Sequence, residues 1–438
     1  MKVVFVYPRF KKYLSDFTRE EQEILVPIVG GFTTPPSLGI PLLAAMTNRE
    51  HQVEVIDDNR GDKVDFDMDA DLVAINCFTP QATRAMELAD GFGKAGKKVI
   101  MGGIFPSFMP DQVLEHADSV NIGEGEPTWE TILEDAGRGE LKRVYKGGNR
   151  FDLAKLPVPR RDVLYGKAGY DWHAALVQTA RGCNFNCAMC VLPAHFGYRV
   201  RTRPVHAIME EIEKTPYDQI YLADDTIFIE KPGIEAWARD LLEKLAHLDK
   251  RLFVSGTLAL NTKQDFFKLL ARAGTKTFYC TLNVDPFSMR ALQGNDRRAE
   301  LKVKDLVSMV NDLGMEFFAS FGMGRDWDDE GVADRILELC GKTGIKTAEF
   351  FLFTPFPGSP HYSRMESQGR LLHKVWEKYN GANVVFKPMK MKPGRLHELY
   401  SYVWRQMYKG AMEDQVLKKL GKQTGASPHP DAGKRSRS

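Results

Sequence analysis

The chain has 438 residues, of which 43% are hydrophobic and 27% charged, and its 60 basic and 58 acidic residues leave a formal net charge of +2. This composition is typical of a soluble globular protein long enough for two domains. The near balance of charge argues against a large nucleic-acid or anionic-membrane interface. The N-terminus lacks the apolar run of a signal peptide, and no stretch is apolar enough for a membrane span. We therefore expect a cytoplasmic protein.

The first 150 residues alternate short apolar strands with amphipathic helices, one of them near 82–96. Strands are expected at 3–7, 52–56, 71–76, 98–101 and 119–122. This alternation predicts an α/β domain over 1–150 with a doubly wound, Rossmann-like parallel sheet. Glycine-rich loops follow several of the strands, and ligands of such sheets bind at those loops.

A polar stretch with prolines breaks this pattern and predicts a linker over 151–170. A second strand–helix series follows the linker. Its strands are expected at 174–179, 219–223, 252–255, 277–282, 316–321 and 347–353. Six strand–helix pairs are too few for a closed eightfold barrel, so we predict a partial (β/α)6 barrel over 171–360. A helical cap over 361–420 and a disordered tail over 421–438 complete the predicted organisation.

Three of the six cysteines, Cys183, Cys187 and Cys190, fall within eight residues just after the first strand of the second series. A secreted disulfide framework would spread paired cysteines over a smaller domain. Three closely spaced thiolates on one loop suit one face of an iron–sulfur cluster and leave one iron open to a chelating molecule. A structural zinc site would need a fourth ligand, for which His195 is the candidate. Buried cysteines without any ligand role are the other alternative.

The segment from Arg181 to Cys190, Arg-Gly-Cys-Asn-Phe-Asn-Cys-Ala-Met-Cys, resembles the signature of the radical S-adenosylmethionine (SAM) superfamily. Met189 departs from that signature, because the family usually has an aromatic residue there, but an apolar, polarisable side chain packs similarly. The resemblance implies a [4Fe–4S] cluster on the three cysteines, with SAM chelated at the open iron. It also implies a 5′-deoxyadenosyl radical that abstracts hydrogen from a substrate, while the protein orients the cofactor.

By the same resemblance, the ends of later strands contact SAM. Asp224 and Asp225 are expected at the SAM ammonium, since carboxylates pair with cations; a turn or helix-cap role is the alternative. Two polar residues that end the third strand suit the SAM carboxylate or ribose, and a glycine after the fifth strand allows close backbone approach. The predicted SAM-binding residues are Met189, Asp224, Asp225, Ser255, Thr257 and Gly322.

The domain order, a doubly wound module before the cysteine-bearing barrel, resembles the cobalamin-dependent radical methyltransferases and the anaerobic magnesium-protoporphyrin cyclase group. Small residues and backbone donors at the strand ends suit a corrin. The Asp-x-His-x-x-Gly motif, whose histidine ligates cobalt, is absent from residues 1–150, so no lower ligand of cobalt is named. The predicted cobalamin contacts are Thr79, Gly102, Gly103, Ser107, Gly125 and Glu126.

The favoured function is therefore a cobalamin-dependent methyltransferase that acts on an unactivated carbon of a small molecule or secondary metabolite. The alternative is a cobalamin-independent radical SAM dehydratase, cyclase or oxidase with a degenerate N-terminal domain, and a non-catalytic scaffold is a third hypothesis. Radical chemistry implies an electron donor such as flavodoxin or ferredoxin. Cys280 and Cys340 occupy apolar positions and are expected to be buried structural thiols. The substrate cannot be read from the sequence.

Overall fold

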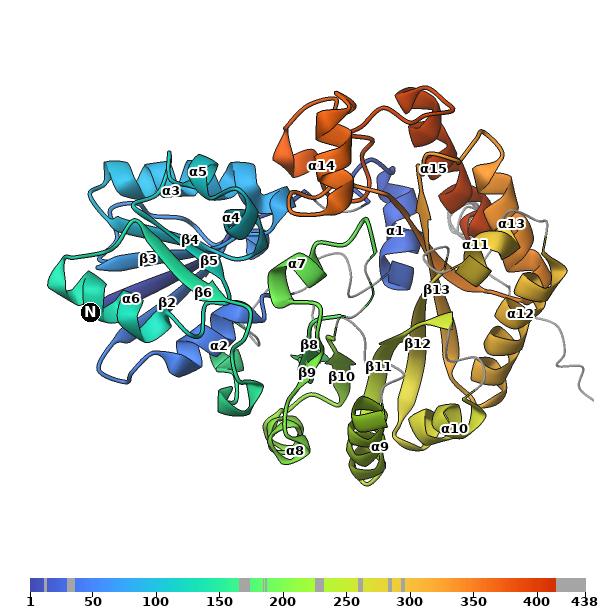
Figure 1. Ribbon diagram of the computed structural model, residues 1–438, viewed down its shortest axis with the longest axis horizontal. Helices are drawn as coiled ribbons and strands as arrows, with labels where there is room; N and C mark the ends of the chain where they lie inside the picture. The colour runs from blue at the N-terminus through green and yellow to red at the C-terminus, as the bar shows by residue number, and fades with distance from the viewer. Residues whose placement is uncertain are drawn as a thin grey trace, which may run out of the picture.

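The computed structural model describes residues 1–11, 14–29, 36–164, 174–183, 185, 187–224, 232–258, 263–282, 286–292 and 296–414. Within these ranges, two six-stranded parallel sheets follow one another along the chain and lie side by side (Figure 1). The predicted α/β class, a Rossmann-like sheet followed by an open barrel-type sheet, is confirmed. Asp225 and the predicted tail over 421–438 lie outside the described residues.

The first sheet has the strand order β2-β1-β3-β4-β5-β6. Its strands are β1 (Lys2–Tyr7), β2 (Gln52–Asp57), β3 (Leu72–Asn76), β4 (Lys98–Gly102), β5 (Ser119–Gly123) and β6 (Val144–Gly148). The hydrophobic runs predicted the first five of these strands. The edge strand β6 was not predicted, because Tyr145 is its one buried residue and its sequence shows no apolar run.

Alternate residues of each strand point to opposite faces of this sheet, and helices cover both faces. Val3 and Phe5 of β1 pack in the cluster that also holds residues of α2 (Gly39–Met46) and α6 (Trp129–Arg138). Val4 and Val6 pack in the cluster that holds α3 (Ala82–Lys94). The short helices α4 (Ile104–Phe108) and α5 (Pro110–Val113) contribute Phe105 and Val113 to the same cluster.

The second sheet has the strand order β14-β13-β12-β11-β10-β7, and every neighbouring pair is parallel. Its strands are β7 (Ala174–Val177), β10 (Gln219–Leu222), β11 (Arg251–Gly256), β12 (Thr275–Leu282), β13 (Glu316–Met323) and β14 (Thr347–Leu352). All six predicted strands are confirmed. Helices line the outer side of the curved sheet (Figure 1). They include α8 (Val205–Lys214), α9 (Pro232–Leu245), α10 (Gln264–Arg272), α11 (Pro286–Leu292), α12 (Arg297–Asp312) and α13 (Val332–Thr343).

Short elements join the two sheets. A two-stranded antiparallel ribbon, β8 (Ala180–Arg181) with β9 (Arg201–Thr202), and α7 (Leu192–Phe196) surround the cysteine segment. After β14 come α14 (Pro360–Ser367) and α15 (Pro393–Met407), and α15 lies beside α1 (Arg19–Val29) in Figure 1. None of the helices in the described ranges is long and apolar enough to cross a bilayer.

Candidate functional site

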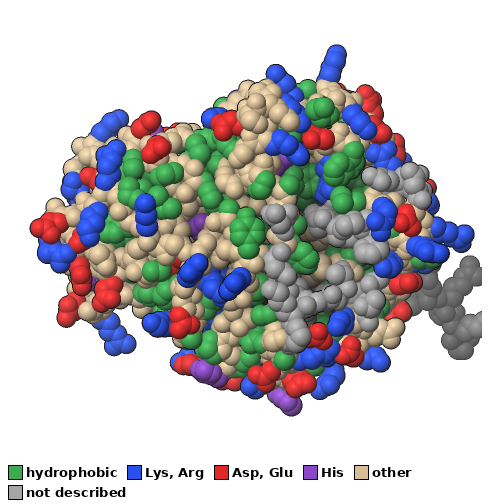
Figure 2. Space-filling view, in the orientation of Figure 1, with side chains coloured by type: hydrophobic (Ala, Val, Ile, Leu, Met, Phe, Trp, Pro, Cys, Tyr) green, Lys and Arg blue, Asp and Glu red, His purple; other side chains and the backbone are tan. Residues whose placement is uncertain are grey.

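A cavity of about 450 Å³ lies between the carboxyl ends of the two parallel sheets. One wall comes from the loops after β3, β4 and β5 and from α2, and the other from the ends of β7, β10 and β11. On the face shown in Figure 2, charged side chains are most numerous toward the outline, and patches of hydrophobic side chains lie between them. Because parallel sheets bind ligands at the carboxyl ends of their strands, this cavity is the candidate functional site.

Glycines shape the wall that the first sheet contributes. Gly103 has a φ of +111°, and a Cβ there would lie 2.7 Å from the carbonyl oxygen of Cys77, so the turn requires glycine. At Gly102 a Cβ would meet only the Cβ of Asn121, at 3.7 Å, and so would project into the cavity. This wall presents backbone and open space where side chains would otherwise stand, which fits the broad face of a corrin.

Four of the six predicted cobalamin contacts, Gly102, Gly103, Gly125 and Glu126, line the cavity. The other two do not belong to its lining. Ser107 donates its hydroxyl to the Gly103 carbonyl at 2.7 Å and accepts from the Gly123 amide at 2.9 Å, so it holds two glycine loops together. Thr79 is buried at the start of a short turn after β3. Their contact with cobalamin stays a prediction.

Apolar side chains from the core of the first domain extend this wall. Phe5, Ile40, Trp129 and Ile132 line the cavity and also pack in the core between the first sheet, α2 and α6. The cavity therefore reaches the helix-covered face of the sheet, and its lining there is hydrophobic. Such a lining favours an apolar ligand portion and excludes water.

Aromatic and polar residues at the strand ends form the second wall. Tyr221 of β10 and Phe253 of β11 are stacked, with ring centroids 4.2 Å apart. Burial raises the pKa of Tyr221 to about 12, so its phenol is neutral at physiological pH. Ser255 also lines the cavity, but Thr257 does not belong to the lining. SAM contacts at both residues stay predictions. This wall combines a flat apolar surface with hydroxyl groups.

Asp224 lies at the end of β10 and lines the cavity. Its carboxylate accepts hydrogen bonds from the amides of Thr179 and Ala180 at 2.6 and 2.8 Å and from the Thr179 hydroxyl at 2.5 Å. Asp224 therefore holds the turn that leads into the cysteine segment, which is the role the sequence left as the alternative. A contact with the SAM ammonium stays a prediction for this residue.

The predicted cysteines lie on the segment between β8 and α7. Cys183, Cys187 and Cys190 are half-buried and form no disulfide, and the Cys190 amide donates to the Cys187 carbonyl at 3.0 Å. Burial raises the pKa of the Cys187 thiol, and the positive charge of Arg325 opposes that shift. In the described part of the chain, no three His, Cys, Asp or Glu side chains are grouped to hold a metal ion, so the thiols are not drawn together here. The fit to a cluster rests on the donor set, three half-buried thiols on one segment.

Other predicted residues near this segment have different surroundings. His195, the candidate fourth zinc ligand, is buried in the cavity wall on α7, and burial lowers its pKa to about 4. Over Gly322, the ring of Phe353 occupies the space that a Cβ would fill, at 2.2 Å. Met189 is not part of the cavity lining. SAM contacts at Gly322 and Met189 stay predictions. Cys280 and Cys340 are buried and outside any disulfide, as expected.

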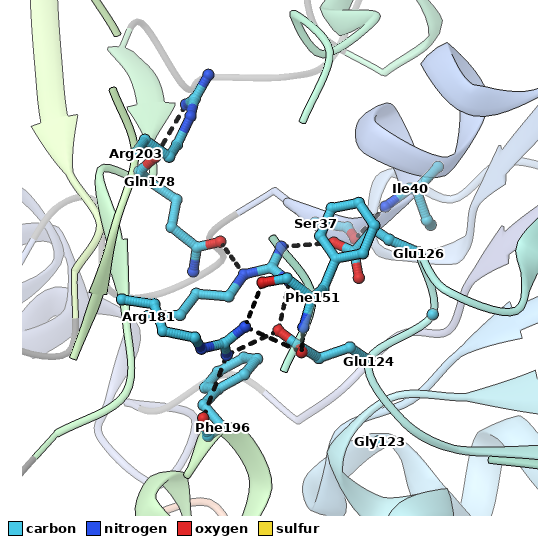
Figure 3. A network of polar contacts seen from close by, with 12 residues as sticks. Ser37, Ile40, Gly123, Glu124, Glu126, Phe151, Gln178, Arg181, Phe196 and Arg203 are labelled. Atoms are coloured by element: carbon cyan, nitrogen blue, oxygen red, sulfur yellow. Dashed lines mark hydrogen bonds and ion pairs between the residues drawn. The ribbon is translucent and has the colours of Figure 1, made fainter. Parts of the chain in front are cut away.

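A network of charged side chains joins the two domains beside the cavity (Figure 3). Arg181 donates to Glu124 at 2.8 Å and to Glu126 at 2.5 Å. Arg201 donates to both carboxylate oxygens of Glu124, at 2.9 and 3.1 Å. Burial would raise the pKa of Glu124, but the hydrogen bonds from Arg201 and Arg181 outweigh it and leave that pKa below its usual value. These pairs, between residues more than 50 positions apart, were not predicted.

We expect the lowered pKa of Glu124 to make folding stability depend on pH. Its carboxylate is ionised more readily in the folded than in the unfolded chain, so the pairing contributes stability above the unfolded pKa of about 4.3. That contribution is lost as the pH falls through the lower folded pKa. Glu124→Gln should therefore lose less stability than the wild type between about pH 5 and pH 3. Urea denaturation across this pH range measures the free energy of unfolding of the wild type and of E124Q. Equal slopes of that free energy against pH in the two proteins would contradict the assignment.

Two family models match the chain: the B12 binding domain over residues 29–133 and the Radical SAM superfamily over residues 177–336. The chain carries a radical SAM domain. Its B12-binding module precedes the radical SAM sheet, as the domain order predicted, and the two matched segments contribute the two walls of the cavity.

Several curated proteins are similar to this radical SAM chain. Bacteriochlorophyllide d C-8(2)-methyltransferase of Chlorobaculum tepidum is 27% identical over 375 residues, which cover 81% of this chain and 82% of that protein. The C-12(1)-methyltransferase of the same organism is 25% identical over 412 residues, with coverages of 92% and 88%. Hopanoid C-2 methylase of Rhodopseudomonas palustris is 23% identical over 392 residues, with coverages of 85% and 71%.

Two solved structures show the same fold. The cobalamin-dependent SAM radical enzyme OxsB with aqua-cobalamin bound has a TM-score of 0.66 and 16% identity, covering 98% of this chain and 69% of that one. The radical SAM methyltransferase TsrM of Kitasatospora setae, with cobalamin and a [4Fe–4S] cluster bound, has a TM-score of 0.58 and 16% identity, with coverages of 84% and 75%. At these identities the likeness concerns the fold alone.

Proposed function

We propose that this radical SAM chain is a cobalamin-dependent methyltransferase that acts on an unactivated carbon of an apolar small molecule. The observation that carries the proposal is the shared cavity. Glycine-rich strand ends of the B12-binding module form one side of it, and strand ends beside the cysteine segment form the other. One cavity would therefore bring the methyl carrier and the radical source to opposite walls, facing a substrate between them.

When bound, the cluster and SAM supply a 5′-deoxyadenosyl radical, and cobalamin supplies the methyl group. The three cysteine thiolates would hold the cluster, and Asp224 and Ser255 would contact SAM at the cavity wall, with Met189, Asp225, Thr257 and Gly322 as further predicted contacts. Gly102, Gly103 and Gly125 would face the corrin. The apolar lining, including the stacked Tyr221 and Phe253, excludes water, which limits side reactions of reactive species.

The cavity lining also supports a substrate class. Bacteriochlorophyllide and the hopanoids, named as substrates of the similar methyltransferases, are polycyclic and largely apolar molecules. The hydrophobic walls of this cavity fit a substrate of that kind. The cobalamin-independent alternative is not favoured, because the B12 binding domain model matches residues 29–133. A low-potential one-electron donor such as flavodoxin or ferredoxin belongs to the same proposal.

Anaerobic reconstitution tests the function. The full chain, purified without oxygen and supplied with iron and sulfide, is expected to bind hydroxocobalamin and shift its visible spectrum, and to form 5′-deoxyadenosine from SAM on reduction. With SAM labelled at the methyl group, the label should appear on the bound cobalamin. A protein that assembles the cluster and cleaves SAM but leaves the cobalamin spectrum unchanged would contradict the methyltransferase proposal.

A further inference from the structure

The buried charge network of Arg181, Arg201, Glu124 and Glu126 joins the cysteine segment to the B12-binding module (Figure 3). In the ribbon of β8 and β9, Arg181 and Arg201 are direct cross-strand partners. Two like charges at opposed positions of an antiparallel pair repel each other. Glu124 accepts hydrogen bonds from both guanidinium groups and so compensates for this repulsion. The ribbon whose two strands flank the cysteine segment in sequence therefore depends on a carboxylate from the other domain.

The burial of these charged groups indicates that they fix the relative orientation of the two domains as well as holding them together. Arg181 is 4% exposed and Glu124 is 2% exposed. Removing such charges from water is costly, and an apolar contact would join two domains without that cost. A guanidinium group, however, presents a rigid fork of donors that fixes the direction of its partners. Here the fork contacts two carboxylates, those of Glu124 and Glu126, at 2.8 and 2.5 Å.

Each end of the charge network is joined to one part of the site by a glycine with a positive φ and no room for a side chain. Gly182, between Arg181 and Cys183, has a φ of +89°, and a Cβ there would lie 2.4 Å from the Arg199 carbonyl oxygen. On the other side, Gly123 has a φ of +86°, and a Cβ there would lie 2.2 Å from the Gly148 carbonyl oxygen. The path from the first cluster cysteine to the glycine wall of the cavity is therefore short and has little backbone freedom.

A second contact supports the cysteine segment further along the chain. The His361 amide donates to the carbonyl of Ala188, between the second and third cysteines, at 2.9 Å. Just before His361, Gly358 lies against the ring of Phe108 in α4, where a Cβ would approach to 2.4 Å. The turn before α14 thus contacts the B12-binding module, and the first turn of α14 contacts the cysteine segment. This contact uses no charges, so the segment stays attached when the charge network is broken.

We propose that Arg181 is a positioning residue that sets the distance and orientation of the iron–sulfur cluster relative to cobalamin. Arg181 is held by hydrogen bonds to Glu124 and Glu126, and Glu124 also accepts from Arg201. This inference rests on the proposed function. Arg181→Met removes the fork and leaves Glu124 paired with Arg201. Cluster assembly and cobalamin binding should continue in this variant, while the spacing between the two cofactors becomes longer or more variable.

The test measures that spacing directly in the full chain loaded with cluster and cob(II)alamin. Both the reduced cluster and cob(II)alamin are paramagnetic, so pulsed electron paramagnetic resonance reports their dipolar coupling. We expect a single coupling in the wild type, a weaker and broader one in R181M, and an intermediate one in R181K, which keeps the charge but not the fork. Misplacement on the scale of 1 Å should raise the 5′-deoxyadenosine formed per methyl transferred by roughly ten- to a hundredfold in R181M.

Arg203→Met is the matched control. Arg203 is buried and shares the buried Glu211 with Arg161, as Arg181 shares Glu124 with Arg201. The described hydrogen-bond partners of Arg203 all lie within the radical SAM part of the chain. R203M should therefore lower stability without changing the dipolar coupling. If R181M does not fold, Glu126→Gln, which removes one of the two negative charges that the fork contacts, gives the same comparison.

Three results would count against the inference. An R181M protein with wild-type coupling and wild-type product ratio would overturn the positioning role and leave the methyltransferase proposal standing. An equal change in R203M would assign the effect to lost stability and would also overturn it. A wild-type chain that binds no cobalamin would overturn both proposals.

Discussion

Cys187→Ala is expected to abolish the iron–sulfur cluster and SAM cleavage while the chain still folds. The predicted cluster has three protein ligands, so the loss of one thiolate leaves two, too few to hold it against competing thiols. Cys187 is half-buried on a loop outside the core, and its removal leaves no large cavity in the sheet. We expect 5′-deoxyadenosine formation to fall at least about a thousandfold, equivalent to about 4 kcal/mol in activation free energy. Iron analysis and product chromatography after anaerobic reconstitution measure both effects.

Cys340→Ala is the matched control for this change. Cys340 is 3% exposed on α13, and burial raises its pKa to about 12, so it is a neutral thiol and a poor metal ligand. The variant should keep its full iron content and its SAM cleavage, with at most a modest loss of stability. A C187A protein that remains iron-rich and cleaves SAM would show that the cluster has other ligands.

Most of the fold was predictable from sequence because most of its strands can be recognised from the apolar runs in their own residues. β13 is buried at seven of its eight positions, and β1 at five of six, so each is a nearly continuous apolar run. Strands buried on both faces of a parallel sheet have this pattern. β6 has one buried residue, Tyr145, and lies at the edge of its sheet, so pairing with β5 rather than hydrophobicity defines it. Its position could not be read from its own residues.

The candidate site was predictable only where the residues that form it are close in sequence. The three cysteines are grouped along the chain, and the glycines follow strands, so both signals are local. Arg181 and Glu124 are 57 residues apart, and no spacing rule connects an arginine before a cysteine with a glutamate between two glycines. Asp224 shows the converse: its position after a strand is visible in the sequence, but its binding of the Thr179 amide is not.

Gly102→Leu is expected to impair cobalamin binding while leaving the cluster intact. The new side chain would start at the end of β4 and project into the cavity, since a Cβ at Gly102 meets only Asn121, at 3.7 Å. No positive φ is required there, so the backbone accepts leucine without strain. Filling space that the corrin needs should weaken cobalamin binding by about 10- to 100-fold, which corresponds to about 1.4 to 2.7 kcal/mol. Absorbance titration with hydroxocobalamin measures the affinity.

Gly93→Leu on α3 separates this effect from the loss of a glycine as such. Gly93 is exposed, and a Cβ there meets no atom within 4 Å, so the variant makes the same change to the unfolded chain without entering the cavity. Wild-type cobalamin affinity in G102L would place the corrin elsewhere. We expect G102L to keep iron and 5′-deoxyadenosine formation but to lose methyl transfer. We expect C187A to keep cobalamin but to lose SAM cleavage. Together these results would show that the two walls of the cavity bind their cofactors independently. Each wall then binds its own cofactor, and the reaction needs both.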